Sequence, residues 1–149
     1  MSLLLATLLL VFAVDRYAKA WAFQSTFVGR KRSIARLLTI LPVRNSRPRY
    51  WPPGTALHWC SSFGLALAAA LLLVGSDPRS SAWLAVGLGA ALGGALGNLY
   101  DRIRHGAILD FLHLGIGGVF NPADVSLVLG LLVALASRFE VATSFLGKG

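Results

Sequence analysis

Three carboxylates within one stretch of the chain are the residues most able to carry out chemistry. The stretch from Gly93 to Ser126 contains Asp101, Asp110 and Asp124, which are three of the six acidic residues of the whole chain. Each lies in or beside strongly apolar sequence, where an ionised carboxylate is costly to keep. Because such residues have little structural use in an apolar setting, we interpret them as the core of an active site.

Asp110 and Asp124 are separated by a glycine-containing loop that can bring them face to face. Asn121 is a favourable N-cap and Pro122 suits the first helical position, which predicts Asp124 in the first turn of a helix. The helix dipole and free N–H groups there favour an anion. Two carboxylates that share a site supply a general base and a general acid, which can activate a water and protonate the leaving amine of a peptide bond.

Further polar residues near the ends of apolar runs are candidates for supporting this pair. Asn98 and Arg102 are four residues apart, with Asp101 on nearly the same helix face, although the two charged residues could instead anchor a helix at a membrane interface. Asp15 and Lys19 are also four apart and can pair on one face. Asp15 is therefore interpreted either as part of a helix-end ion pair or as a residue beneath the active site.

Metal and thiol chemistry are weaker interpretations of the same residues. His105 and His113 have no metal-ligand spacing relative to the aspartates. Cys60, the one cysteine of the chain, can form neither an internal disulfide nor a thiol cluster, and on a helix it points away from His58. The spacing therefore disfavours a metal site, and we interpret Cys60 as a small buried residue.

The elements that must position these residues are apolar and long. With 56% hydrophobic and 13% charged residues, the composition is not that of an ordinary soluble domain. Four apolar runs are long enough to span a hydrocarbon core of roughly 30 Å, and they lack the polar stripes of a soluble bundle. The chain is predicted to be a single all-α integral membrane domain, 1–149, with four transmembrane helices at about 3–23, 56–75, 82–100 and 123–139.

The first apolar run is interpreted as a retained helix rather than a cleavable signal peptide. The residues before it carry no basic side chain, and Asp15 and Arg16 interrupt it. The third run carries Gly89, Gly93 and Gly97 at four-residue spacing, which predicts close packing against a neighbouring helix.

Residues 24–55 are predicted to form a long loop, because four prolines and Gly54 disfavour a continuous helix. Within it, Leu37 to Val43 is interpreted either as a short strand or as an amphipathic piece on the bilayer. Seven of the chain's basic residues fall in this loop, and the net charge is +8. Since nothing there matches a nucleic-acid module, we predict contact with phospholipid headgroups and no nucleic-acid partner.

Three motifs, in order and joined to apolar helices, resemble those of bacterial lipoprotein signal peptidases (signal peptidase II). A shorter match is Asp15-Arg16-Tyr17-Ala18-Lys19, which resembles the Asp-x-x-x-Lys motif of that family. The three motifs are Gly93-Gly-Ala-Leu-Gly-Asn-Leu-Tyr-Asp-Arg102, Gly106-Ala-Ile-Leu-Asp-Phe111 and Phe120-Asn-Pro-Ala-Asp124.

The resemblance implies an intramembrane-type aspartyl endopeptidase without metal or cofactor. Its substrate would be a diacylglyceryl-modified prolipoprotein, cut just before the lipidated cysteine, with Asp110 and Asp124 as the catalytic dyad. The residues implied to support the dyad or the substrate are Asp15, Lys19, Asn45, Asn98, Asp101, Arg102 and Asn121. The resemblance further implies a multi-pass monomer in the bacterial cytoplasmic membrane. Its active site and the loop or β subdomain between the first two helices would lie toward the outer face, with both termini inside.

Two features depart from that family. The first loop of the family carries an Asn-x-Gly-Ala-Ala-Phe-like motif, and here only Asn45 matches it. In addition, residues 16–55 and 101–119 hold eleven of the fourteen Lys and Arg residues. Taken alone, the positive-inside rule would therefore place the long loop in the cytoplasm.

Two other function classes remain open at this point. A non-catalytic relative would bind lipid or lipidated peptides through the basic loop without cutting them. A small proton-coupled carrier would use the intramembrane aspartates as a proton relay. Both predict that replacing Asp110 or Asp124 causes no proteolytic defect.

Overall fold

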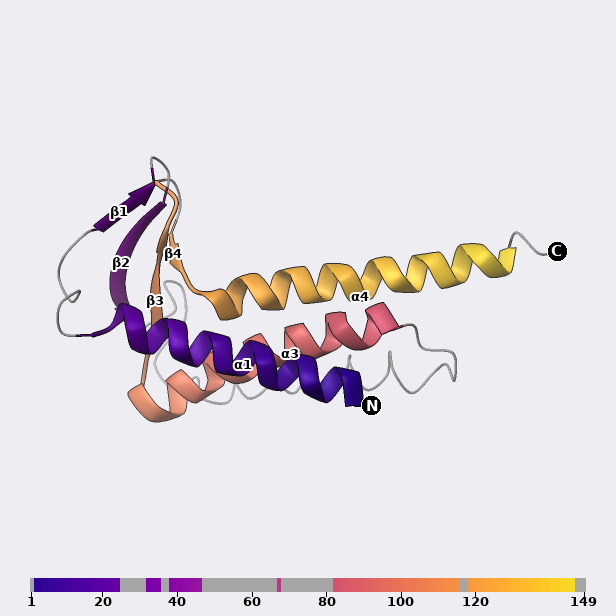
Figure 1. Ribbon diagram of the computed structural model, residues 1–149, viewed down its shortest axis with the longest axis horizontal. Helices are drawn as coiled ribbons and strands as arrows, with labels where there is room; N and C mark the ends of the chain where they lie inside the picture. Colours follow the sequence, from indigo (N-terminus) through magenta and orange to yellow (C-terminus); the bar gives the residue numbers. More distant parts are fainter. Residues whose placement is uncertain are drawn as a thin grey trace.

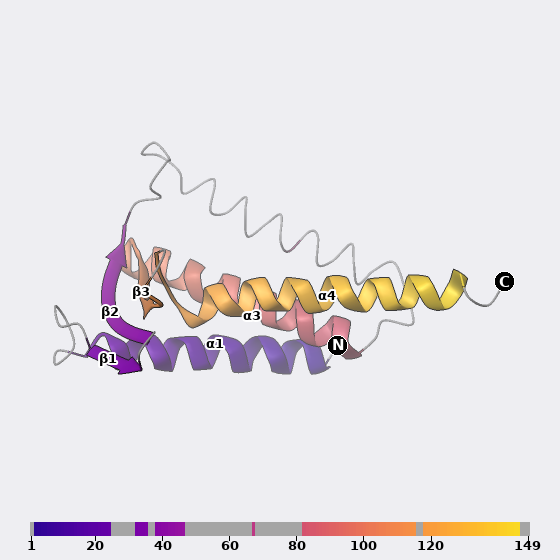
Figure 2. The same cartoon turned by 90° about the horizontal axis from the view of Figure 1, so that it is seen from above.

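Three long helices run side by side, and a small sheet lies across one end of them (Figure 1). The computed structural model of the protein describes residues 2–24, 32–35, 38–46, 67, 82–115 and 118–146. The helices are α1 (Ser2–Ala22), α3 (Ala82–His105) and α4 (Pro122–Leu146). α1 and α3 run toward the sheet and α4 runs away from it, so the two termini lie at the opposite end (Figures 1 and 2).

The structure therefore describes three of the four predicted helices. The fourth, 56–75, lies outside the described residues apart from residue 67, and so do His58 and Cys60. Two described helices are long and apolar enough to cross a membrane, namely Ala82–His105 and Pro122–Phe139. On the second of these, Val128, Leu129 and Leu132 are each more than half exposed. An apolar surface of this kind suits a lipid environment.

α3 extends five residues beyond its predicted end at residue 100. The polar run Asp101-Arg-Ile-Arg-His105 continues the helix, and its basic residues in the last turn complement the helix dipole. Gly106 ends the helix with φ +65°, and its N–H donates to the Arg102 carbonyl at 3.0 Å. A left-handed glycine after the last turn is a common helix stop.

The sheet is a correction to the predicted all-α fold. Its antiparallel order is β1-β2-β3-β4, with β1 (Arg32–Ala35) and β2 (Leu38–Asn45) from the long loop. β3 (Ile108–His113) and β4 (Val119–Phe120) come from the segment between α3 and α4. The β subdomain predicted between the first two helices is present as β1 and β2, and it is larger than predicted. It also includes β3 and β4, because an apolar segment too short to span pairs its backbone groups with β2.

The strand alternative for Leu37 to Val43 is the one that the structure contains. β2 pairs Ile40 with Leu112 and Val43 with Asp110, so one extra residue is accommodated between the two pairs. Pro42 lies in this bulge and has no N–H to donate to a ladder, which is why the regular pairing breaks there.

Glycines allow α3 to approach α1 at backbone contact, as their spacing predicts. A Cβ built on Gly89 would lie 2.6 Å from the Leu4 carbonyl oxygen, and one on Gly93 would lie 2.7 Å from the Leu8 carbonyl oxygen. Real Cβ atoms do not approach so closely. Small residues at these positions therefore set the distance between the two helices.

A second set of glycines brings α3 against α4. A Cβ on Gly87 would lie 2.7 Å from the Gly130 carbonyl oxygen, and a Cβ on Gly130 would lie 2.5 Å from the Ala91 backbone nitrogen. α3 is thus held closely between two neighbours, and the ends of all three helices meet beside the sheet.

We expect Gly130→Ala to lower the thermal stability of the protein. Helix propensity alone predicts a gain of about 1 kcal/mol, but overpacking against backbone atoms costs about 1–3 kcal/mol. Thermal unfolding in detergent micelles measures the net effect. Gly118→Ala is the control, because a Cβ there meets nothing within 4 Å. A melting temperature for Gly130→Ala at or above that of the control would contradict the close packing.

Candidate active site

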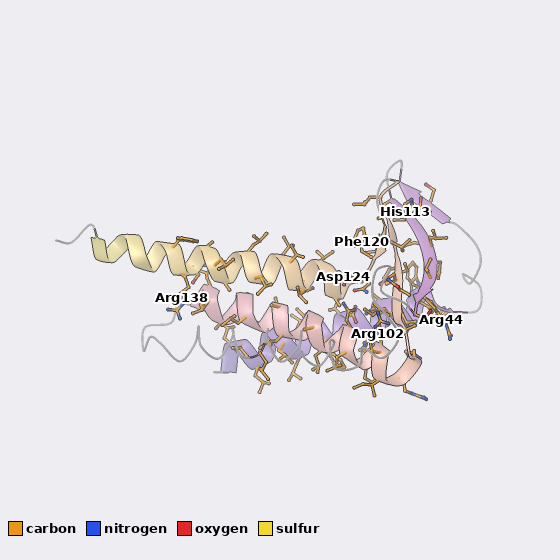
Figure 3. The ribbon with its side chains drawn as sticks, turned by 180° about the vertical axis from the view of Figure 1, so that it is seen from behind. Arg44, Arg102, His113, Phe120, Asp124 and Arg138 are labelled. Carbon is orange, nitrogen blue, oxygen red and sulfur yellow. The ribbon has the colours of Figure 1, made fainter. Side chains whose placement is uncertain are left out.

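Polar side chains gather where the ends of α1 and α3 meet the start of α4 and the strand β3. Figure 3 shows Asp124 at the start of α4, with Arg102 and Arg44 at the nearby edge of the sheet. Eight of the nine predicted site residues are joined there by hydrogen bonds and ion pairs. They are Asp15, Lys19, Asn45, Asn98, Asp101, Asp110, Asn121 and Asp124.

Asn121 is the N-cap that the sequence predicts for α4. Its Oδ1 accepts the Asp124 backbone N–H at 3.0 Å, and its own backbone N–H donates to Asp124 Oδ2 at 3.1 Å. This reciprocal pair is a capping box, in which the residue at the third helical position returns the hydrogen bond. The cap fixes the Asp124 side chain at the helix start, over the end of α3.

Asn121 also binds the second carboxylate. Its Nδ2 donates to Asp110 Oδ1 at 2.7 Å, so one residue binds Asp110 through its side chain and the Asp124 carboxylate through its backbone N–H. Asp110 Oδ2 accepts a further hydrogen bond from Asn45 Nδ2 at 3.2 Å. Asn121 is fully buried and Asp110 is 4% exposed. A cap residue and two strands thus hold Asp110 next to the start of α4.

Asn98 supplies the link from α3. Its Nδ2 donates to Asp124 Oδ1 at 2.7 Å. Its Oδ1 accepts hydrogen bonds from Asn121 Nδ2 at 3.1 Å and from Lys19 Nζ at 3.0 Å. These three partners fix the orientation of the Asn98 amide, with its N–H₂ toward the Asp124 carboxylate.

The two carboxyl groups have different environments. Burial raises the pKa of the Asp110 carboxyl above its ordinary value, and the nearby charge of Asp124 adds to the rise. Hydrogen bonds from Asn121 and Asn45 act in the opposite direction without cancelling it. Asp124 in turn accepts two N–H groups at a helix start. A carboxyl whose pKa is raised, beside a second carboxylate, can serve as the acid of an acid–base pair.

Beneath this pair lies a cluster of two carboxylates and two cations. Lys19 Nζ is 3.0 Å from Asp15 Oδ2 and 2.7 Å from Asp101 Oδ2. Arg16 donates to the same two carboxylates, at 2.5 Å in each case. Asp15 and Asp101 are fully buried, and Lys19 is 1% exposed. The four charges compensate one another away from water.

Each buried carboxylate also accepts a backbone N–H from another element. Asp15 Oδ1 accepts the N–H of Ala123, in the first turn of α4, at 3.1 Å. Asp101 Oδ2 accepts the N–H of Leu109, in β3, at 3.2 Å. The charge cluster therefore positions the two elements that carry Asp124 and Asp110. Both interpretations of Asp15 apply: it forms an ion pair with Lys19, and it lies beneath the site, where it binds the first turn of α4.

Arg102 lies beside the cluster rather than within it. Its Nη1 donates to the Ser46 backbone carbonyl at 3.3 Å, next to Asn45 in the chain. Arg102 thus ties the end of β2 to the end of α3, and its charge lies near Asp110.

Arg16 is the site residue that the predictions omitted. It donates to Asp15, to Asp101 and, at 3.1 Å, to the Gly97 carbonyl. Its position next to Asp15 suggested only an interrupted apolar run. The available signal was the i to i+3 spacing of Arg16 and Lys19, which places two cations on one side of α1.

Within the described residues, no group of three His, Cys, Asp or Glu side chains is arranged to hold a metal ion. The carboxylates here are instead partnered by amide groups and cations, as set out above.

Comparison with known proteins gives a consistent family. The family model described as signal peptidase (SPase) II matches residues 7–139. The lipoprotein signal peptidase of Syntrophomonas wolfei is 35% identical over 130 residues, covering 85% of this chain and 86% of that protein. The lipoprotein signal peptidase of Mycobacterium leprae is 36% identical over 147 residues, covering 90% of this chain and 71% of that protein.

The fold also matches solved structures. A bacterial membrane enzyme solved by the in meso method at 2.3 Å resolution superimposes with a TM-score of 0.80 and 21% identity, covering 97% of this chain and 92% of that one. A second, at 1.9 Å resolution, gives a TM-score of 0.82 with 22% identity over 93% of each chain.

We expect Lys19→Gln to destabilise the protein strongly. Removal of one partner from a buried ion pair typically costs about 3–5 kcal/mol, and here it leaves Asp15 and Asp101 with less positive charge. Thermal unfolding of the purified protein in detergent measures the loss. Arg104→Gln removes an exposed cation from the last turn of α3 and serves as control. Equal melting temperatures for the two variants would show that the buried cluster adds no stability.

Proposed function

The chain belongs to the signal peptidase II family, and we propose that it is an aspartyl endopeptidase that uses Asp110 and Asp124 as its catalytic dyad. Its substrate is a prolipoprotein whose cysteine already carries a diacylglyceryl group, and it cuts the signal peptide just before that cysteine. The observation that carries this proposal is that one buried residue, Asn121, binds both carboxyls, Asp110 through its side-chain N–H₂ and Asp124 through its backbone N–H.

The unequal environments of the dyad suggest a division of roles. Asp124, which accepts hydrogen bonds from Asn98 and the Asn121 backbone, acts as the base that takes a proton from water. The water oxygen bonds to the scissile carbonyl carbon. Asp110, whose pKa is raised by burial, donates its proton to the departing amine as the carbon–nitrogen bond breaks.

The remaining site residues act by positioning in this proposal. Asn98 holds the Asp124 carboxyl and Asn121 holds the Asp110 carboxyl by hydrogen bonds, and Asn45 orients Asp110 from β2. Arg102 holds the end of β2 over the site through Ser46. Asp15 accepts a backbone N–H of α4 and Asp101 accepts one of β3, and Lys19 pairs with both carboxylates. These contacts determine where the dyad lies.

The proposed setting is the bacterial cytoplasmic membrane, with the chain as a monomer and its active site toward the outer face. The basic strand β2 lies at the same end of the molecule as the dyad, and both termini lie at the other end (Figure 1). The site and the described strands β1 and β2 therefore share one side of the membrane in this proposal. Phospholipid headgroups on that side are the partners we propose for the basic loop residues.

We expect Asp110→Asn and Asp124→Asn each to lower the cleavage rate by about 10²- to 10⁴-fold or more, because each removes one half of an acid–base pair. A gel-shift assay with a diacylglyceryl-modified prolipoprotein and purified protein in detergent measures the rate. Glu140→Gln removes a carboxylate from the distal part of α4 and should retain activity.

Two other results of that assay would decide between the function classes. Wild-type protein that is folded but does not cut a verified substrate would favour a non-catalytic relative that binds lipidated peptides. Cleavage that survives either dyad substitution would exclude the dyad assignment.

The pH dependence of cleavage tests the role of Asp110 as the acid. Its raised pKa lets it keep a proton to higher pH, and activity falls as the pH rises through that pKa. The Asn45 amide favours the ionised form, so Asn45→Ala should move the alkaline limb of the profile to higher pH. Thr39→Ala, elsewhere on β2, should leave the limb in place. A limb that moves to lower pH in Asn45→Ala would reverse the proposed role.

A further inference from the structure

A cavity of about 410 Å³ opens on the side of the sheet away from the dyad. Its walls come from the last turns of α1, the end of α3 and the strands β2 and β3. The residues that give it its character are Arg16, Lys19, Phe23, Arg44, Tyr100 and His105.

The strand pairing separates this cavity from the active site. Arg44 lies opposite Leu109 and Val43 lies opposite Asp110 in the β2–β3 ladder. Because successive side chains point to opposite faces of a strand, Leu109 and Asp110 face opposite ways. Leu109 and Arg44 line the cavity, whereas Asp110 binds Asn121 on the other face.

The charge of the cavity is positive. Arg16, Lys19 and Arg44 face it, together with His105. The carboxylates that oppose them are Asp15 and Asp101, which are paired with Arg16 and Lys19. Within the described part of the chain no carboxylate pairs with Arg44, so an uncompensated cation remains at the wall.

Two guanidinium groups supply hydrogen-bond donors. Lys19 already contacts Asp15, Asp101 and Asn98, so its three N–H groups are in use. Arg16 Nε is different: it is buried and has no acceptor among the described residues. The Tyr100 ring, 4.8 Å from the Arg16 guanidinium carbon, holds this group in place. An anion in the cavity would receive hydrogen bonds from the exposed Arg44 and would lie beside the positive charge of Arg16.

The surroundings of the cavity indicate the depth at which it lies. Tyr17, Trp21 and Tyr100 are exposed at this end of α1 and α3, at 78%, 37% and 43%. Exposed tyrosine and tryptophan are typical of the level of lipid headgroups. Phe23 and Leu109 add apolar wall beside the cations.

We propose that this cavity binds the phosphodiester group of an anionic phospholipid. Arg44 and Arg16 contact the phosphate, and Phe23 and Leu109 contact the adjoining glycerol and the first methylenes of the acyl chains. The site uses neither Asp110 nor Asp124, and it shares Arg16 and Lys19 with the charge cluster that positions them. Its binding energy adds to the stability of the fold, because the cavity joins α1, α3 and the sheet.

The test is a titration of thermal stability with short-chain lipids. Purified full-length protein in a neutral detergent receives dioctanoylphosphatidylglycerol, dioctanoylphosphatidylcholine or sn-glycerol 3-phosphate. We expect only the phosphatidylglycerol to raise the melting temperature in a saturable way. Arg44→Gln should weaken its apparent affinity about tenfold, since it removes a charge-assisted contact.

Arg104→Gln is the matched control, because it removes an exposed cation near the same helix end that does not line the cavity. It should bind as the wild type does. Three results would each overturn the proposal: equal affinity of the wild type and Arg44→Gln, equal binding of the zwitterionic lipid, and an equal Arg44-dependent shift with glycerol phosphate. The last result would identify a soluble phosphate ester as the ligand.

Discussion

The structure depends on a set of four charges, of which three are buried and the fourth, Arg16, is partly exposed. Asp15 and Asp101 are fully buried, and they share Arg16 and Lys19 between them. Loss of one member leaves the others uncompensated in a medium of low dielectric constant, so the set forms as a whole or not at all. Through the remaining lone pairs of its carboxylates it also holds the start of α4 and the strand β3. The elements that carry the two candidate catalytic residues are thus attached to the same charges.

One asparagine connects helix formation with the chemistry of the site. Asn121 caps α4, because its Oδ1 accepts the free backbone N–H of Asp124. The Nδ2 of the same side chain donates to Asp110 and Asn98. A substitution that keeps the cap, such as serine or aspartate, would not reproduce its N–H₂ contacts. The residue is therefore constrained by two requirements at once.

The sequence was sufficient where the signal is local. The Asn121 cap, the glycine spacing of α3 and the pairing of Asp15 with Lys19 follow from separations of three or four residues. The sheet was not predictable in this way, because Asn45 and Asp110 are 65 residues apart and strand pairing leaves no periodic trace in either segment. The β2–β3 ladder uses backbone groups, and Asn45 is the β2 residue whose side chain binds Asp110. The apolar run predicted the membrane-spanning part of α3 and not its end, because the charged turn after residue 100 continues the helix without adding apolar residues.

The glycines of α3 repeat every four residues, and this repeat affects how α1 is aligned along the axis of α3. Gly89 and Gly93 make the same kind of backbone contact with α1. A shift of α1 by one four-residue repeat, about 6 Å along the helix axis, would therefore restore much the same contacts. Close packing alone therefore leaves the longitudinal position of the two helices degenerate. The ion pair of Arg16 with Asp101 is not repeated along the helices, so it can form at only one axial position of α1 relative to α3. The glycines set the distance between the two helix axes. The Arg16–Asp101 pair selects one axial position of α1 among several that are one glycine repeat apart.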